Sequence, residues 1–226
     1  MIKRIYRMQV TEKDIWVVTY PRSGTTWTQE MVWNILNNLD FERARKTDID
    51  EKFFFLDMDI LNSHSHGDAP GFLDKAEAKV GQQRLIKSHL PLHLLPPDLL
   101  TKCKVVYVAR NPKDVVVSYY HHHKLTKSVE QDLQFPDFVK FFMSELLVQD
   151  PYMAHVKEGV SMMNNPNMKF LWYEDMKRDL PAAIRDVASF LNKDLNDSDI
   201  AALADYLDVK NMKENPAVNH QDRHQR

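Results

Sequence analysis

A strand, a tight turn and a helix are predicted in direct succession near the start of the chain. The run Ile15–Thr19 is rich in β-branched and aromatic side chains, which is typical of a buried strand. The segment 28–39 then repeats apolar residues at helical spacing, among them Met31 and Ile35. Residues 20–27 must therefore form a short strand-to-helix turn.

The residues of this turn favour an anion site. Unpaired backbone N–H groups and the positive end of the helix dipole point toward whatever lies over such a turn. Gly24 lets the backbone come close to a ligand, and Arg22 adds a fixed positive charge. Hydroxyl donors come from Ser23, Thr25 and Thr26. Phosphate is the usual ligand of a turn built in this way.

Two observations keep other interpretations of the turn open. Ser, Gly and Thr are ordinary helix-capping residues, so the turn alone also fits a purely structural role. The nucleotide-binding P-loop, G-x-x-x-x-G-K-[ST], is built similarly but is not matched here. This turn has a single glycine, and its cation, Arg22, precedes that glycine.

Further strands are predicted at 84–89, 105–109 and 168–173. The run 105–109 is continuously apolar, as in a central parallel strand, and it leads to Arg110 just before a predicted helix. Ligands of open α/β sheets bind at the carboxyl ends of the strands. Two basic strand-to-helix turns therefore predict two anionic ligands, or one ligand with two phosphates. Lys87 and His89 lie at the end of another strand, where a histidine is more often structural than catalytic.

Helices are predicted between and after these strands. They start near 96–100 and near 113, cover 137–148, start again at Pro151, and then cover 184–191 and 197–207. Strands that alternate with helices predict an α/β protein with a parallel sheet. The run 53–56 is expected in the core, or in the wall of a substrate pocket. The segment 62–71 is expected to be a surface loop, and its His64 and His66 lack a recognisable metal-ligand spacing.

Length and composition set broad limits. The 226 residues are expected to form one domain, 1–226, with 43% apolar residues and a net charge of −2. This charge gives no general reason to expect a nucleic acid or a membrane partner, and no run of about 18 apolar residues occurs. The single cysteine, Cys103, excludes an intrachain disulfide framework. Without an apolar signal core at its start, the chain is expected in the cytoplasm.

Four segments together resemble the cytosolic sulfotransferase family. Residues 20–27, Y-P-R-S-G-T-T-W, resemble its Y-P-K-S-G-T-T-W loop, and residues 87–91, K-S-H-L-P, are similar to its K-T-H-L-P segment. Residues 107–114 with 118–120 resemble its second signature, and residues 173–177 match a fourth segment. The resemblance implies a P-loop-like parallel sheet flanked by helices. It also implies transfer of a sulfuryl group from 3′-phosphoadenosine 5′-phosphosulfate (PAPS) to the hydroxyl of a small apolar acceptor, such as a phenol or steroid.

The resemblance also implies a role for each matching residue. His89 would be the general base, while Lys87, Arg22 and Ser118 would stabilise charge on the sulfuryl group and the bridging oxygen. The nucleotide, PAPS or its product 3′,5′-diphosphoadenosine (PAP), would contact a larger set. This set is Arg22, Ser23, Gly24, Thr25, Thr26, Trp27, Arg110, Ser118 and Tyr173. The acceptor pocket would include Phe55, Met58, His89 and His122, and no metal would be needed.

The sequence departs from the family at two places. Arg22 stands where the family usually has lysine, and we expect it to act by charge rather than as a proton donor. The family's C-terminal R-K-G-x-x-G-D-W segment is not matched before Arg226, nor is its dimerisation segment. The domain is therefore expected to be truncated at its C-terminus, with its oligomeric state open. A weak or inactive nucleotide-binding relic remains an alternative, and a P-loop kinase is a more distant one.

Overall fold

A five-stranded parallel sheet forms the centre of the computed structural model, which describes residues 1–61 and 70–219. The strands follow the order β2-β3-β1-β4-β5, and every neighbouring pair is parallel. The strands are β1 (Ile15–Thr19), β2 (Phe54–Phe55), β3 (Leu85–Ser88), β4 (Lys104–Ala109) and β5 (Met168–Trp172). Because the strands are parallel, all their carboxyl ends meet at one edge of the sheet.

Helices connect the strands, as parallel pairing requires. Those before β4 are α1 (Ile2–Tyr6), α2 (Thr25–Leu36), α3 (Phe41–Lys46), α4 (Ile49–Lys52), α5 (Met58–Leu61), α6 (Phe72–Glu77), the 3₁₀ turn η1 (Leu92–Leu94) and α7 (Leu99–Lys102). Those after β4 are α8 (Pro112–Leu125), α9 (Phe135–Met143), α10 (Tyr152–Ser161), α11 (Tyr173–Arg178), α12 (Leu180–Phe190), α13 (Asp197–Tyr206), α14 (Val209–Glu214) and α15 (Pro216–Asn219).

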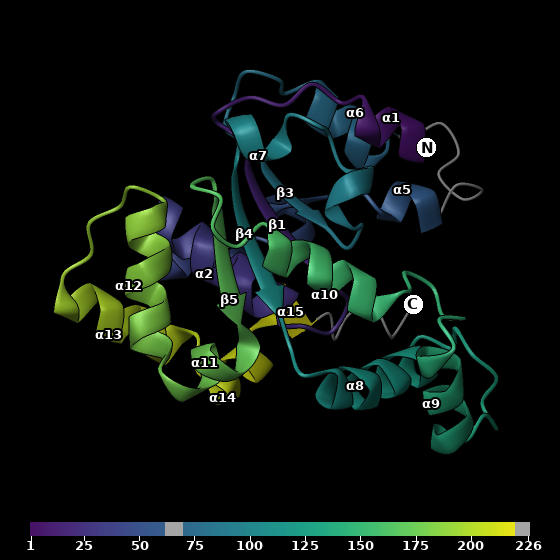
Figure 1. Ribbon diagram of the computed structural model, residues 1–226. Coiled ribbons are helices and arrows are strands. Elements are labelled where there is room, and N and C mark those ends of the chain that lie inside the picture. Colours follow the sequence, from purple (N-terminus) through teal and green to yellow (C-terminus); the bar gives the residue numbers. More distant parts are fainter. Residues whose placement is uncertain (62–69, 220–226) are drawn as a thin grey trace.

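The two faces of the sheet carry separate apolar cores. In β1, Ile15 and Val17 belong to a core shared with α2, α12 and α13, whereas Trp16 and Val18 belong to the core of the opposite face. Figure 1 shows α2 and α12 on one side of the sheet and α10 on the other. Strands buried on both faces read as continuous apolar runs, which is why β1 and β4 were evident in the sequence.

Helices α8 and α9 extend beyond the carboxyl edge of the sheet (Figure 1). A third apolar cluster joins them to the turn after β1, and Tyr20 is its centre. The Tyr20 ring meets the Tyr152 ring edge-on, with the ring centroids 4.9 Å apart, and its hydroxyl donates to Asp150 over 2.8 Å. The turn after β1 is therefore held from the side of α8 and α10 as well as by its own strand and helix.

The predicted fold class, an α/β protein with a parallel sheet flanked by helices, is confirmed. The edge strand β2 and the two short helices of the charged stretch 40–52 were not predicted, because segments this short carry no clear period. The segment 62–69, with the loop prediction and His64 and His66, lies outside the described residues. Across the described ranges, no helix is long and apolar enough to cross a bilayer.

Several predicted boundaries are wrong: α12 begins at Leu180 rather than at 184, and three further elements end elsewhere than predicted. Helix α2 begins at Thr25 and ends at Leu36 rather than spanning 28–39, because Asn38 and Leu39 take positive φ angles of 54° and 59°. Helix α9 ends at Met143 instead of continuing to 148, and Glu145, at a φ of 58°, follows it. The third of these elements is β5, which ends at Trp172 rather than at 173, because Tyr173 is already the first residue of α11.

Candidate active site

The turn between β1 and α2 requires its glycine. Gly24 is the N-cap of α2 and has a φ of 102°, a left-handed conformation that side-chain-bearing residues rarely adopt. A Cβ at this position would lie 2.7 Å from Cδ2 of Tyr173, which opens α11 after β5. The backbone of the predicted anion turn and an aromatic ring are therefore in direct contact, and Gly24 permits that approach.

The two basic strand-to-helix turns meet at the carboxyl edge of the sheet. Arg22 Nε donates to Ser118 Oγ over 3.1 Å, and Arg110 NH1 donates to the Arg22 carbonyl over 3.0 Å. The Arg110 guanidinium also lies over the Tyr173 ring, with its central carbon 4.3 Å from the ring centroid. We call Arg22, Arg110, Ser118 and Tyr173 the arginine cluster. It unites predicted site residues from three separate strand ends.

Polar groups of this region are buried without a partner. Within the described residues, Ser23 Oγ and Arg110 Nε are buried and make no hydrogen bond. Buried donors left unpaired cost about 1–3 kcal/mol each, so a ligand with acceptor oxygens suits them. Trp27 and Tyr173 lie beside this region with ring centroids 5.5 Å apart, and Trp27 Nε1 donates to the Leu207 carbonyl over 2.8 Å. These groups fit an adenine nucleotide that carries phosphates.

His89, just beyond the end of β3, is held as a neutral imidazole. Its Nδ1 lies 2.8 Å from the Thr19 carbonyl, which can only accept, so Nδ1 carries the proton and Nε2 keeps a free lone pair. The Thr19 hydroxyl in turn lies 2.7 Å from that of Thr25 in α2. Burial and the charge of Lys87 bring the pKa of His89 well below its ordinary value. This imidazole is uncharged near neutral pH.

Lys87 and His89 share one aromatic neighbour, as their spacing on the strand predicts. The Lys87 ammonium is 3.8 Å from the centroid of Phe55 in β2, and the His89 ring meets Phe55 edge-on at 5.3 Å. Burial lowers the pKa of Lys87 to about 8, against the charges of Asp50 and Asp57, which raise it. A cation and a neutral base therefore lie side by side against the same ring.

Sequence reasoning missed the groups that hold the His89 peptide. The Asp57 carboxylate accepts from the His89 N–H over 2.6 Å and from the Ser88 hydroxyl over 2.7 Å. On the other side, His155 Nε2 donates to the His89 carbonyl over 3.2 Å, and its Nδ1 lies 2.5 Å from the Tyr107 hydroxyl. No sequence pattern identifies these residues, because they belong to different elements and form no motif with His89.

Apart from His89, the residues predicted for the acceptor pocket come from three elements, β2, α5 and α8. Phe55 contacts both Lys87 and His89, whereas Met58 opens α5 and is half-buried. His122 lies on α8. Its pKa falls to about 4, first because of burial and then because of nearby Arg22, with smaller effects of other cations including Lys87. Its imidazole is therefore neutral and close enough to the basic groups to sense their charge.

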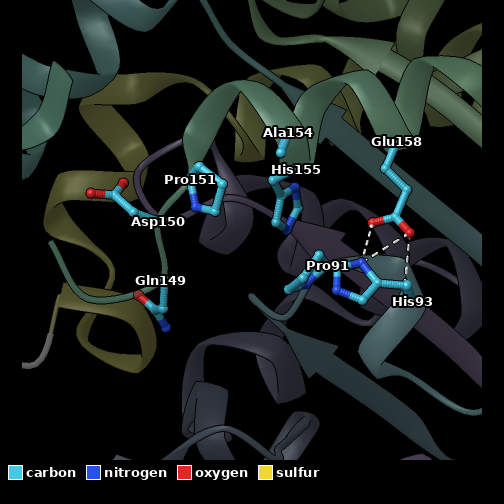
Figure 2. Close-up of a pocket in the computed structure, with 8 residues that line it drawn as sticks. All are labelled: Pro91, His93, Gln149, Asp150, Pro151, Ala154, His155 and Glu158. Carbon is cyan, nitrogen blue, oxygen red and sulfur yellow. Dashed lines mark hydrogen bonds and ion pairs between the residues drawn. The ribbon is translucent and has the colours of Figure 1, made fainter. Parts of the chain in front are cut away.

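A cavity of about 220 Å³ lies on the far side of the His89 peptide. It is lined by Pro91, His93, Gln149, Asp150, Pro151, Ala154, His155 and Glu158 (Figure 2). His155 forms part of the cavity wall and also donates to the His89 carbonyl. The cavity is therefore separated from the His89 ring by the His89 peptide. Figure 2 shows Glu158 directed toward His93, and Glu158 Oε1 lies 3.2 Å from Nδ1 of the His93 imidazole. None of Phe55, Met58 and His122 lines this cavity, and neither do Arg22, Lys87, His89 and Arg110.

Comparison with known proteins identifies the family. The sulfotransferase domain model matches residues 12–226. The chain belongs to the sulfotransferase family. Luciferin sulfotransferase of Photinus pyralis is 38% identical over 98% of this chain, and dog sulfotransferase 1B1 is 35% identical over 92%. A crystal structure of retinol dehydratase with androsterone and the inactive cofactor PAP is 36% identical, with a TM-score of 0.90 over 98% of this chain.

The match covers this chain more fully than it covers its relatives. The chain spans 62% of the luciferin sulfotransferase, 68% of the dog enzyme and 71% of the retinol dehydratase chain. The predicted sulfotransferase fold, a parallel sheet flanked by helices, is confirmed. In residues 1–61 and 70–219, no group of three His, Cys, Asp or Glu side chains is placed to hold a metal ion.

Proposed function

We propose that this sulfotransferase domain binds PAPS at the carboxyl edge of its sheet and transfers the sulfuryl group to the hydroxyl of a small apolar acceptor. The observation that carries the proposal is the convergence of a neutral, buried imidazole with a lysine and with the arginine cluster. His89 supplies a base, Lys87 supplies a charge beside it, and Arg22 and Arg110 supply charge for two anionic groups. The family membership and the PAP-bound relatives support the choice of donor.

The nucleotide would use both strand-to-helix turns. Ser23, Gly24, Thr25 and Thr26, with Arg22, would hold the 5′-phosphosulfate through backbone N–H groups, hydroxyls and charge. Arg110 and Ser118 would hold the 3′-phosphate, which matches the unpaired Arg110 Nε. The rings of Trp27 and Tyr173 would contact adenine, since both lie beside the turn.

The chain's own groups account for the charge and proton movements of the reaction. The acceptor oxygen forms a bond to sulfur while the bond from sulfur to the bridging phosphate oxygen breaks, and the phosphate keeps that electron pair. The hydroxyl proton passes to Nε2 of His89. This nitrogen is free to accept it, because the ring's own proton is on Nδ1, where it is donated to the Thr19 carbonyl. Lys87, Arg22 and Ser118 stabilise the negative charge that develops on the sulfuryl and bridging oxygens.

The acceptor class follows from the surroundings of His89. Phe55 places an aromatic ring against both His89 and Lys87, and Met58 and a neutral His122 would extend an uncharged wall. Relatives with this fold have been solved with retinol and with androsterone, both apolar alcohols, and another relative is named for luciferin. We infer an alcohol or phenol on an apolar ring system or chain.

Substitution of His89 tests the proposed function. His89→Ala should reduce turnover with PAPS and a phenol or sterol acceptor by about 10²–10⁴-fold, the usual effect of removing a general base. Its affinity for PAP, measured by calorimetric titration, should stay close to that of the wild type because the arginine cluster is intact. His121→Ala, at an exposed position on α8, is the matched control and should retain turnover.

Two outcomes would contradict the proposal in different ways. Near-normal turnover in His89→Ala would show that another group takes the proton. Tight PAP binding by a wild-type chain that turns over none of the acceptors screened would favour a nucleotide-binding relic. A screen with labelled PAPS and several phenols, sterols and isoprenoid alcohols decides between these cases.

A further inference from the structure

A buried carboxylate closes the turn that presents His89. Asp57 follows the edge strand β2 and is only 2% exposed. One carboxylate oxygen accepts from the His89 N–H over 2.6 Å, and the other accepts from the Ser88 hydroxyl over 2.7 Å. Ser88 Oγ accepts in turn from the Leu90 N–H over 3.0 Å. Three consecutive residues of the turn are therefore tied directly or through one hydroxyl to Asp57.

The same carboxylate lies beside Lys87. Phe55 of β2 is the register partner of Lys87, and the N–H of Leu56, one residue before Asp57, donates to the Lys87 carbonyl over 3.3 Å. The charges that bear on the Lys87 ammonium are Asp50 in α4 and Asp57 after β2, which favour its protonation, and Arg22 after β1, which opposes it. The Phe55 ring covers the ammonium from β2. Burial lowers the pKa of Lys87 to about 8, so the loss of one nearby anion would lower it further, toward neutral pH.

We propose that Asp57 is a positioning residue for sulfuryl transfer, which fixes the His89 peptide and keeps the Lys87 ammonium charged beside it. The proposal rests on the proposed function above and adds a residue that does not itself touch the reacting groups. A purely structural carboxylate would stabilise the turn without any effect on the ionisation of Lys87. The effect of Asp57 on the charge of Lys87 therefore distinguishes a positioning residue from a purely structural one.

Two substitutions separate the two roles of Asp57. In Asp57→Asn, the amide oxygen can still accept from the His89 N–H, and the amide nitrogen can donate to Ser88 Oγ in a reversed bond, so both contacts can be kept while one charge is lost. In Asp57→Ala, both the hydrogen bonds and the charge are lost. Asp59 offers a matched control, because it is equally buried and accepts from the N–H groups of Phe72 and Leu73 at the start of α6.

The experiment measures kcat/KM against pH, PAP affinity and the ionisation of Lys87. For Asp57→Asn we expect the alkaline limb of the pH profile to move to lower pH, with unchanged PAP affinity. For Asp57→Ala we expect a further loss of kcat of about 10²-fold, as for a small displacement of a catalytic group. Asp59→Asn should lower the melting temperature without moving the alkaline limb. The ¹³Cε shift of Lys87, titrated by NMR, should show a lower pKa in both Asp57 variants.

Clear results would overturn the inference. An unmoved alkaline limb and an unmoved Lys87 titration in Asp57→Asn would show that the carboxylate does not act on Lys87. A normal kcat in Asp57→Ala, with only a lower melting temperature, would reduce Asp57 to a structural cap. If the wild type transfers no sulfuryl group, the proposed function fails, whereas the NMR titration still decides whether Asp57 keeps Lys87 charged.

Discussion

His89 is held from three directions by groups that lie far apart in the sequence. Thr19 fixes its ring, Asp57 its backbone N–H and His155 its backbone carbonyl. Each contact limits a different motion of the residue, so the free Nε2 has little freedom to turn away. In the proposed role of general base, His89 would have met its ordering cost during folding rather than during the reaction, which would favour a fast proton transfer.

The charge of Arg22 can be separated from its geometry by substitution. Arg22→Ala should lower kcat strongly, whereas Arg22→Lys should retain much of it, because the position needs a cation and not a proton donor. The leaving phosphate, whose second pKa is about 6, needs little help from a donated proton. Single-turnover rates of sulfuryl transfer in the two variants check this.

A control and a contradictory result are available for Arg22. Arg185 in α12 is an exposed arginine paired with Asp197, and Arg185→Ala should leave the rate unchanged. If Arg22→Lys proves as slow as Arg22→Ala, then the guanidinium fork itself is required. In that case the fixed geometry of the guanidinium would be the reason, since lysine cannot donate to Ser118 from one nitrogen and contact the ligand with others.

At the scale of elements, the carboxyl edge of the sheet joins three strand-to-helix turns. Gly24 after β1, Arg110 after β4 and Tyr173 after β5 are in mutual contact through the Tyr173 ring. Each helix begins where its strand ends, so each N-terminus is directed to the same region. Two cationic turns and an aromatic ring are brought together in this way by the topology of the sheet.

Substitutions of two glycines test whether the close approach of Tyr173 to the turn after β1 is needed for nucleotide binding. Gly24 and Gly81 both have positive φ angles, 102° and 84°, but a Cβ at Gly81 would meet nothing within 4 Å. Both alanine variants should lose about 1–2 kcal/mol of stability from backbone strain. Gly24→Ala should in addition displace Tyr173 and weaken PAP binding by about 10- to 100-fold, the equivalent of one lost base–aromatic stack.

The comparison of the two glycine variants has a clear negative outcome. Calorimetric titration with PAP and thermal unfolding would be measured on both proteins under the same conditions. Equal PAP affinity in Gly24→Ala and Gly81→Ala would show that the close approach of Tyr173 to the turn has no part in nucleotide binding.

Across the whole molecule, buried polar networks connect the site to distant elements. In α2, Glu30 pairs with Lys52 of α4 over 2.5 Å and accepts from the hydroxyl of Tyr206 in α13 over 2.8 Å. Asn215 donates to the same hydroxyl over 2.8 Å. Helix α2, which begins at the turn after β1, is therefore braced by α4, by α13 and by Asn215 near the C-terminal end of the described residues. Because such a buried pair is costly to break, loss of one partner would destabilise the fold.

Acid should destabilise the fold through His155. Burial lowers the pKa of His155 to about 4 in the folded protein, against 6.5 in the unfolded chain. At a pH between these two values, the unfolded chain therefore binds a proton at His155 that the folded chain does not bind. This contribution to stability is complete above 6.5 and is lost as the pH falls toward 4. At about pH 5 the loss from His155 alone is about 2 kcal/mol.

A variant isolates this effect from carboxylates that act in the opposite direction. Burial raises the pKa of Asp57 to about 6, so protonation of Asp57 on acidification stabilises the folded state. The change in the unfolding free energy of the wild type is therefore the sum of this gain and the loss from His155. His155→Gln can still donate to the His89 carbonyl but cannot titrate. The free energies of unfolding of wild type and variant are measured by urea unfolding. The difference between them should become smaller by about 2 kcal/mol from about pH 7.5 to about pH 5. A constant difference would show that His155 is not held neutral.

The sequence by itself determined the local elements and the chemical character of the site. Apolar runs and helical spacing predicted β1, β3, β4, β5 and the main helices, because these periods reflect which faces are buried. They misplaced the ends of α2 and α9, where Leu39 and Leu146 continue the apolar spacing after the backbone has left the helix. The placement of Arg22, Lys87, His89 and Arg110 at strand ends already implied a common edge.

Only the tertiary structure decided how these residues act. Thr19 and His89 are 70 residues apart, yet their contact selects the nitrogen that can accept a proton. Asp57 and His155, which fix the His89 peptide, carry no motif, and the lowered pKa of Lys87 depends on burial by β2. Parallel strands bring together the ends of distant segments, so the contacts made there depend on the order of the strands and not on any local pattern.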